Sequence, residues 1–203
     1  IIYPAKASDK PSDFGIADVV LFCVKSFDTE SSSYLIKPVV GPETIVIPFL
    51  NGLGHIEIMQ KVLGVNNVIG GVAAISALIS EPGVIKHIEG NRFSLGEPSE
   101  VNSERLKTLS GLFISGGLKA PQKKQIRDEI WIKLLGNCSF NPISAITGMS
   151  LDVLGNDPSS RFLVQTLMEE CQKVGEAVGA KFNISIENRI NGAASIIGHK
   201  PST

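Results

Sequence analysis

Two valine-rich apolar runs constrain the fold of this chain more than any other feature of its sequence. Residues 17–24 (ADVVLFCV) and 44–50 (TIVIPFL) are apolar almost without interruption. Such continuous runs are typical of parallel strands that are covered on both faces, because strands with one wet face alternate polar and apolar residues. A helical segment expected over 28–40 and the break at Gly41-Pro42 separate the runs. We therefore predict a β-α-β unit with parallel strands.

The sheet pattern continues toward the middle of the chain. Residues 55–63 predict a second helix and residues 67–77 a third strand. After Glu-Pro-Gly, the segments 84–90 and 92–98 are interpreted as a short antiparallel pair, and 103–115 returns to helical periodicity. The first part of the chain therefore predicts an α/β domain.

From residue 122 onward the strand signals disappear, so we divide the chain into a sheet domain over 1–121 and an all-helical domain over 122–203. One long helix is expected over 159–178, with Gly179 at its end. Its predicted core face consists of apolar residues at helical spacing: Phe162, Leu163, Leu167, Cys171, Val174 and Val178.

Composition excludes several classes of partner. A formal net charge of −1 and a pI near 6.4 give no basic excess for nucleic acid or an anionic membrane. No apolar run approaches the ~20 residues that a bilayer span needs. Three cysteines without C-x-x-C spacing predict neither a disulfide framework nor a zinc site, and they favour a reducing, cytoplasmic setting. Cys23 lies inside an apolar run and is expected to be a core thiol. The three histidines have no metal-ligand spacing and are expected at the surface or at helix starts. Small polar molecules are the expected partners.

The segment IWIKLLGNCSFNP, residues 130–142, carries Lys133, Asn137 and Asn141 at intervals of four among apolar neighbours. Positions four apart drift only about 40° around a helix, so the three side chains lie along one stripe. Burying them without partners would cost several kcal/mol, which favours a polar pocket or a water-filled cleft. Pro142 withholds a helical N–H and tends to kink the helix.

Two interpretations of this stripe are open. Lys133 could extend its amine to solvent while Asn137 and Asn141 bond to neighbouring backbone. Alternatively, Lys133 gives a proton to a substrate oxygen and the asparagines hold that substrate. Lys25 and Asn51 follow the two predicted strands at their carboxyl ends, where open α/β sheets bind ligands. Their simpler roles would be a solvated loop charge and a turn former.

Several segments in order resemble one family, the ketopantoate reductases (2-dehydropantoate 2-reductases). They are ADVVLFCVKSF, FLNGLG, EPGVIKHIEGNRFSLGE, HKPST and above all EIWIKLLGNCSFNPISAITG, whose K-x-x-x-N-x-x-x-N-P pattern is similar to the substrate helix of the family. The resemblance implies a partial Rossmann-type parallel sheet domain followed by an all-helical C-terminal domain like that of 6-phosphogluconate dehydrogenase. It also implies NADPH-dependent reduction of ketopantoate to pantoate in pantothenate and coenzyme A biosynthesis.

The resemblance further implies roles for individual residues. Lys133 matches the catalytic lysine that gives a proton to the ketone oxygen. The other matches are substrate-binding Asn137, Asn141 and Ser202, and cofactor-binding Lys25, Asn51 and Ala77.

The sequence departs from the family in ways that leave alternatives open. Nothing matches G-x-G-x-x-G, no basic residue follows a second strand to bind a 2′-phosphate, and residues 146–154 lack a further substrate asparagine. We expect a missing piece at both ends, and NADP comes from the resemblance alone. A related 2-oxoacid or β-hydroxyacid dehydrogenase and a non-catalytic binding or dimerisation module are the alternatives. A homodimer is left open.

Overall fold

The computed structural model describes residues 5–201. The chain forms two compact units. One holds the described residues up to 73 together with 91–126, and the other holds 74–90 together with the described residues from 127 onward. Each unit is described by itself below.

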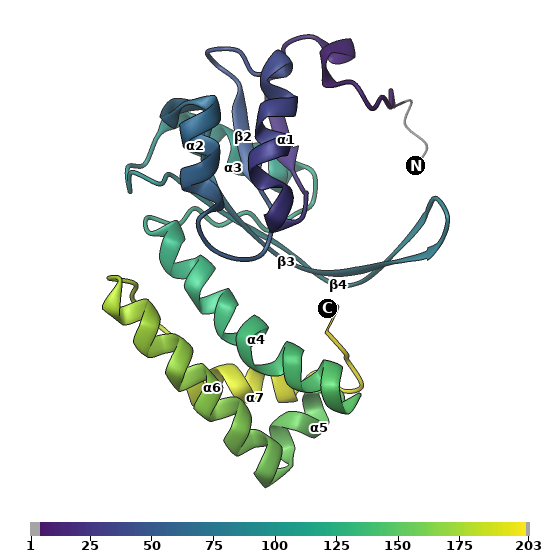
Figure 1. Cartoon of the computed structure of the whole chain (residues 1–203), viewed down its shortest axis with the longest axis vertical. Coiled ribbons are helices and arrows are strands. Elements are labelled where there is room, and N and C mark those ends of the chain that lie inside the picture. Colours follow the sequence, from purple (N-terminus) through teal and green to yellow (C-terminus); the bar gives the residue numbers. More distant parts are fainter. Residues whose placement is uncertain (1–4, 202–203) are drawn as a thin grey trace. The chain divides into compact units, whose positions relative to one another are not determined.

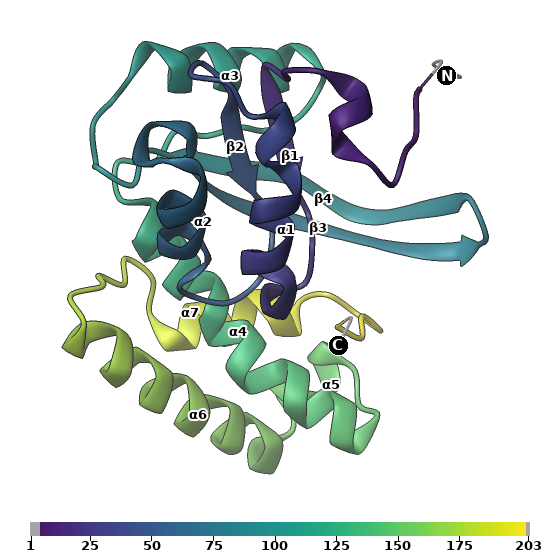
Figure 2. The same cartoon turned by 45° about the horizontal axis from the view of Figure 1, so that its top comes forward.

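The first unit contains the predicted parallel pair, strands β1 and β2 (Figure 2). Strand β1 (Val19–Phe22) pairs in parallel with β2 (Ile45–Pro48), in a register that sets Val19 opposite Ile45. Helix α1 (Thr29–Ile36) lies between them in the chain, with short 3-10 turns before and after it. Val46 of β2 also forms an isolated parallel bridge with Val68. The predicted β-α-β unit is confirmed, with strands shorter than the apolar runs.

One part of that prediction is wrong, because β1 is not covered on both faces. Leu21 is 53% exposed, and Cys23 is an exposed free thiol just beyond the end of the strand. The described residues give β1 a strand partner on one edge only, namely β2. By contrast, Val46 and Ile47 of β2 are fully buried.

Helices pack on the sheet to form the first core. Helix α2 (His55–Leu63) follows β2 and lies beside α1 in both views (Figures 1 and 2). Helix α3 (Glu104–Ser115) begins at Ser103, whose hydroxyl accepts the Leu106 N–H at 3.2 Å, a side-chain cap. Both helices were predicted. The core cluster consists of Ile47, Ile69, Leu95, Leu106, Leu109 and Ala120.

Strands β3 (Gly70–Glu81) and β4 (Val84–Gly96) form a long two-stranded sheet. The short antiparallel pair expected between 84–90 and 92–98 is therefore wrong, since both segments belong largely to β4. The chain reverses at Gly83, where φ is +80°, and it continues through Gly90 at φ +76° without turning. A Cβ at Gly90 would collide with the carbonyl oxygen of Ala74, so this glycine serves a close approach within the sheet, not a turn.

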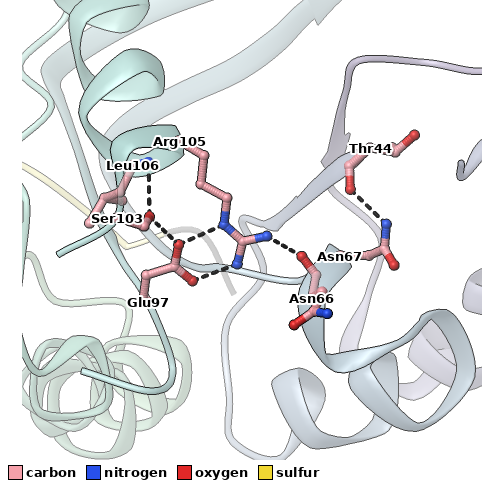
Figure 3. Close-up of polar contacts among 7 residues, drawn as sticks. All are labelled: Thr44, Asn66, Asn67, Glu97, Ser103, Arg105 and Leu106. Atoms are coloured by element: carbon pink, nitrogen blue, oxygen red, sulfur yellow. Dashed lines mark hydrogen bonds and ion pairs between the residues drawn. The ribbon is translucent and has the colours of Figure 1, made fainter. Parts of the chain in front are cut away.

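An ion pair between buried Glu97 and partly exposed Arg105 joins the end of β4 to α3 (Figure 3). The carboxylate of Glu97, 4% exposed, accepts hydrogen bonds from Arg105 at 2.7 and 2.6 Å and from the Ser103 hydroxyl at 2.5 Å. Arg105 also donates to the Asn66 carbonyl. Burial alone would raise the pKa of Glu97, but the hydrogen bonds from Arg105 and Ser103 and the charge of Arg105 outweigh it and hold the pKa below its usual value.

The second unit is helical apart from the hairpin segment 74–90. Its helices are α4 (Ile126–Thr147), α5 (Leu151–Asn156), α6 (Pro158–Ala177) and α7 (Ile186–Ala194). Their shared core is built from Leu135, Phe140, Ile143, Leu151, Leu154, Val164, Met168, Ile190 and Ala193. None of the described helices is long and apolar enough to cross a membrane.

The long helix α6 occurs where it was predicted, but its core face is different. Val164, Met168 and Gly175 are buried, whereas most of the residues expected there are exposed, namely Phe162, Leu163, Val174 and Val178. Gly175 explains part of the difference. A Cβ on it would lie 2.7 Å from the ring of Phe182, so the glycine admits an aromatic side chain that an apolar count overlooks.

Candidate functional site

The stripe predicted on the long helix is present on α4. Lys133, Asn137 and Asn141 are each half-buried, and the helix runs on through Pro142. Within residues 5–201, neither asparagine amide is hydrogen-bonded to protein atoms, in contrast to Ser139, whose hydroxyl donates to the Leu135 carbonyl at 2.6 Å. The interpretation that these asparagines serve only the local backbone is therefore not supported. Half-buried amides of this kind can bind a polar ligand.

The electrostatics of Lys133 are set by its burial. Burial lowers its pKa below 10.5, because the apolar surroundings disfavour the charged ammonium. The residue is half-buried, so part of its side chain packs against protein atoms. A lysine whose pKa lies closer to neutrality gives up its proton more readily, so this environment suits a proton donor.

A second cation lies against α4 and was not anticipated from the sequence. The guanidinium of Arg189 on α7 lies 2.7 Å from the position that a Cβ on Gly136 would occupy. A glycine inside a helix costs about 1 kcal/mol relative to alanine, which was the available signal that something packs closely there. The sequence could not show that the neighbour is Arg189, fifty-three positions further along the chain.

The sheet unit brings together the loops that follow β1 and β2. Lys25 and Asn51 are both exposed, each three residues beyond the end of its strand. A Cβ on Gly52 would lie 3.9 Å from the Cβ of Ser26, so the two loops are neighbours. Parallel strands predict this, because their carboxyl ends meet at one edge of the sheet.

The remaining predicted site residues lie elsewhere. Ala77 is exposed on β3, within the segment that belongs to the helical unit. Ser202 lies outside the described residues. Residues 5–201 contain no group of three or more His, Cys, Asp or Glu that could hold a metal ion.

His55 differs from the other two histidines. It begins α2, as a helix-start histidine was expected to do, but it is only 2% exposed. Neither ring nitrogen has a hydrogen-bond partner of normal geometry. Its position directly after the loop Asn51-Gly52-Leu53-Gly54 was visible in the sequence, whereas its burial was not.

Comparison with known proteins places this architecture in one family. Residues 1–100 match the sequence profile "Ketopantoate reductase PanE/ApbA" and residues 125–203 match "Ketopantoate reductase PanE/ApbA C terminal". The 2-dehydropantoate 2-reductase of Mesorhizobium japonicum is 38% identical over 98% of this chain and 67% of its own length. The enzyme of the same name from Halobacterium salinarum is 27% identical over 95% of this chain and 63% of its own.

Solved structures agree with this result. The 2-dehydropantoate 2-reductase of Geobacter metallireducens superposes with a TM-score of 0.88 at 28% identity, covering 95% of this chain and 65% of that one. D-mandelate dehydrogenase, solved with NADH and anilino(oxo)acetate, shares the fold with a TM-score of 0.84 at 23% identity, covering 93% and 62%.

An α/β unit and an all-helical unit are the fold that the two family profiles and the solved oxidoreductases of this family share. The chain belongs to the ketopantoate reductase family, as its sequence motifs predicted. It spans about two thirds of the length of the relatives named above.

Proposed function

We propose that the chain carries the machinery for NADPH-dependent reduction of 2-dehydropantoate (ketopantoate) to pantoate, a step of pantothenate biosynthesis. Membership of the family supports this proposal, and the observation that carries it is the α4 stripe. Lys133 is half-buried with a lowered pKa, and Asn137 and Asn141 are half-buried on the same face. This combination supplies one proton donor and two neutral groups that can orient a small polar substrate.

The chemistry assigns a separate role to each side chain. A bound nicotinamide supplies the hydride that reaches the ketone carbon. The ketone oxygen gains negative charge as the carbon–oxygen double bond becomes single, and the ammonium of Lys133 stabilises that charge more in the transition state than in the ground state. The proton then moves from Nζ to the oxygen, which gives the alcohol. Asn137 and Asn141 hold the substrate hydroxyl and carboxylate without pairing with the ammonium.

As cofactor contacts we propose Lys25 and Asn51 at the sheet edge, with Ala77 as a third. As a further substrate contact we propose Ser202. In this proposal residues 1–121 are the remainder of an NADP-binding domain and residues 122–203 are the substrate domain. The preference for NADP over NAD, the homodimer and the cytoplasmic setting stay predictions.

Substrate comparison tests the proposal. We expect the chain to oxidise NADPH with ketopantoate and to show a lower kcat/KM with other branched 2-oxoacids and with NADH. The absorbance of the reduced nicotinamide follows each reaction. Faster turnover of another 2-oxoacid would favour a related dehydrogenase. If the folded chain neither binds NADPH nor turns over, the non-catalytic alternative holds for it.

The lowered pKa of Lys133 predicts an alkaline limit to activity. The proton donor must be protonated, so kcat is full below the folded pKa of Lys133 and falls as pH rises through it. Burial lowers this pKa, so the fall begins at a lower pH than the 10.5 of an ordinary lysine would give. A pH profile of kcat under saturating substrate measures it. A kcat that stays flat up to the ordinary lysine pKa contradicts the assignment.

A further inference from the structure

The histidine at the start of α2 has an energetic cost that packing does not explain. His55 is 2% exposed and both ring nitrogens lack a partner of normal hydrogen-bond geometry. A buried polar group left in this state costs about 1–3 kcal/mol, and an apolar ring of similar size would avoid that cost. Packing alone therefore favours a different residue at this position.

One acceptor that acts on the ring, the Gly52 carbonyl, is in the loop that carries Asn51. Burial is the largest effect and lowers the pKa of His55, while the charge of Glu57 and, more weakly, the Gly52 carbonyl favour the protonated ring. The ring is therefore neutral near neutral pH and retains one N–H donor. A small displacement of the loop would bring the Gly52 carbonyl into hydrogen-bond geometry with it.

The loop has the conformational freedom for such a displacement. Gly52 has φ +103° and Gly54 has φ +79°, which are left-handed values that glycine adopts without strain. A Cβ on Gly54 would meet nothing within 4 Å, and one on Gly52 would meet only Ser26. The backbone between Asn51 and His55 is therefore not tightly packed.

We infer that His55 is a positioning residue for Asn51: after a small displacement of the loop its ring N–H donates to the Gly52 carbonyl, and this bond holds Asn51 at the sheet edge where the proposed nicotinamide cofactor would bind. The identity of this ligand rests on the proposed function, but the hydrogen bond between the ring and the loop does not. His55 itself does not touch the reacting atoms and acts through Asn51.

Two variants of the whole chain separate this role from a structural one. His55→Phe keeps a buried ring without a donor, and His55→Gln restores an N–H. We expect the His55→Phe protein to unfold at the same temperature as the wild type or higher. Its amide NMR signals of residues 51–54 should shift and broaden. Its NADPH affinity should fall about tenfold, the value of one hydrogen bond. His55→Gln should recover much of the affinity and of the loop signals.

Three results would overturn the inference. They are loop signals that do not change in His55→Phe, a His55→Gln protein that behaves like His55→Phe, and unchanged NADPH affinity despite an altered loop. The ring ¹⁵N signals of wild-type His55 decide the matter if His55→Phe fails to fold, since one of them must move on addition of NADPH. If wild-type chain does not bind NADPH, the proposed function fails, and the loop signals of the variants still test the hydrogen bond.

Discussion

Replacing Lys133 by alanine is expected to reduce kcat with ketopantoate by a factor of about a hundred to ten thousand, the range for loss of a positioned proton donor. The ammonium would both stabilise the developing oxyanion and deliver the proton, and no other residue of the α4 stripe carries a charge. Substrate would still be held by Asn137 and Asn141, so KM should change much less than kcat.

Two controls accompany this measurement. Lys133→Met keeps an unbranched stem of similar length, so it separates lost charge from lost packing. Lys173→Ala removes an exposed lysine from α6 in the same unit and should leave kcat unchanged. Near-normal turnover by a folded Lys133→Ala protein would rule out Lys133 as the donor.

The parts of the fold that were predictable from sequence are those specified by local patterns. The two apolar runs predicted β1 and β2, and the predicted helix 55–63 coincides with α2. Gly179 was predicted to end the long helix. It lies two residues after the last residue of α6 with φ +93°, and its N–H donates to the Glu176 carbonyl at 3.0 Å. Each of these features depends on residues close together in the chain, so their physical signals appear in short windows.

The errors in the fold prediction arose where a residue packs against another that is distant in the sequence, and where a glycine permits close packing and does not form a turn. Segments 84–90 and 92–98 were expected to pair with each other, but β4 runs through Gly90, which admits the backbone of Ala74. The face of α6 was assigned by counting apolar side chains, whereas Gly175 faces the ring of Phe182. In both cases the absence of a side chain was the informative feature, and its meaning depended on a neighbour that the sequence does not identify.

The candidate site divides in the same way. The stripe on α4 was predictable because helical spacing alone aligns Lys133 with Asn137 and Asn141. Adjacency of the loops after β1 and β2 followed from parallel pairing. The burial of His55 and the contact between Arg189 and Gly136 were not predictable, because both depend on tertiary packing.

The second large effect is expected in the stability of the sheet unit, at the ion pair between Glu97 and Arg105. Arg105→Leu should lower the free energy of unfolding by about 2–3 kcal/mol at neutral pH, because it leaves the buried Glu97 carboxylate with the Ser103 hydroxyl as its remaining side-chain donor. Denaturant unfolding measures the loss. Lys107→Leu is the matched control on the same helix, since its pair with Glu104 is exposed on both sides and contributes about 0–1 kcal/mol.

The pH dependence of this loss provides a further test of the ion pair. In the wild type the pKa of Glu97 is held below its usual value, so its contribution to stability is present above the unfolded pKa, about 4.3, and is lost as pH falls through the folded pKa. Without Arg105, burial dominates and raises the pKa of Glu97, so the carboxyl takes up a proton at higher pH and the penalty of an unpaired buried charge disappears. The stability difference between wild type and Arg105→Leu should therefore shrink as pH falls from 7 toward 4. A difference that stays constant over this range would mean that Arg105 stabilises α3 by packing and not through the charge of Glu97.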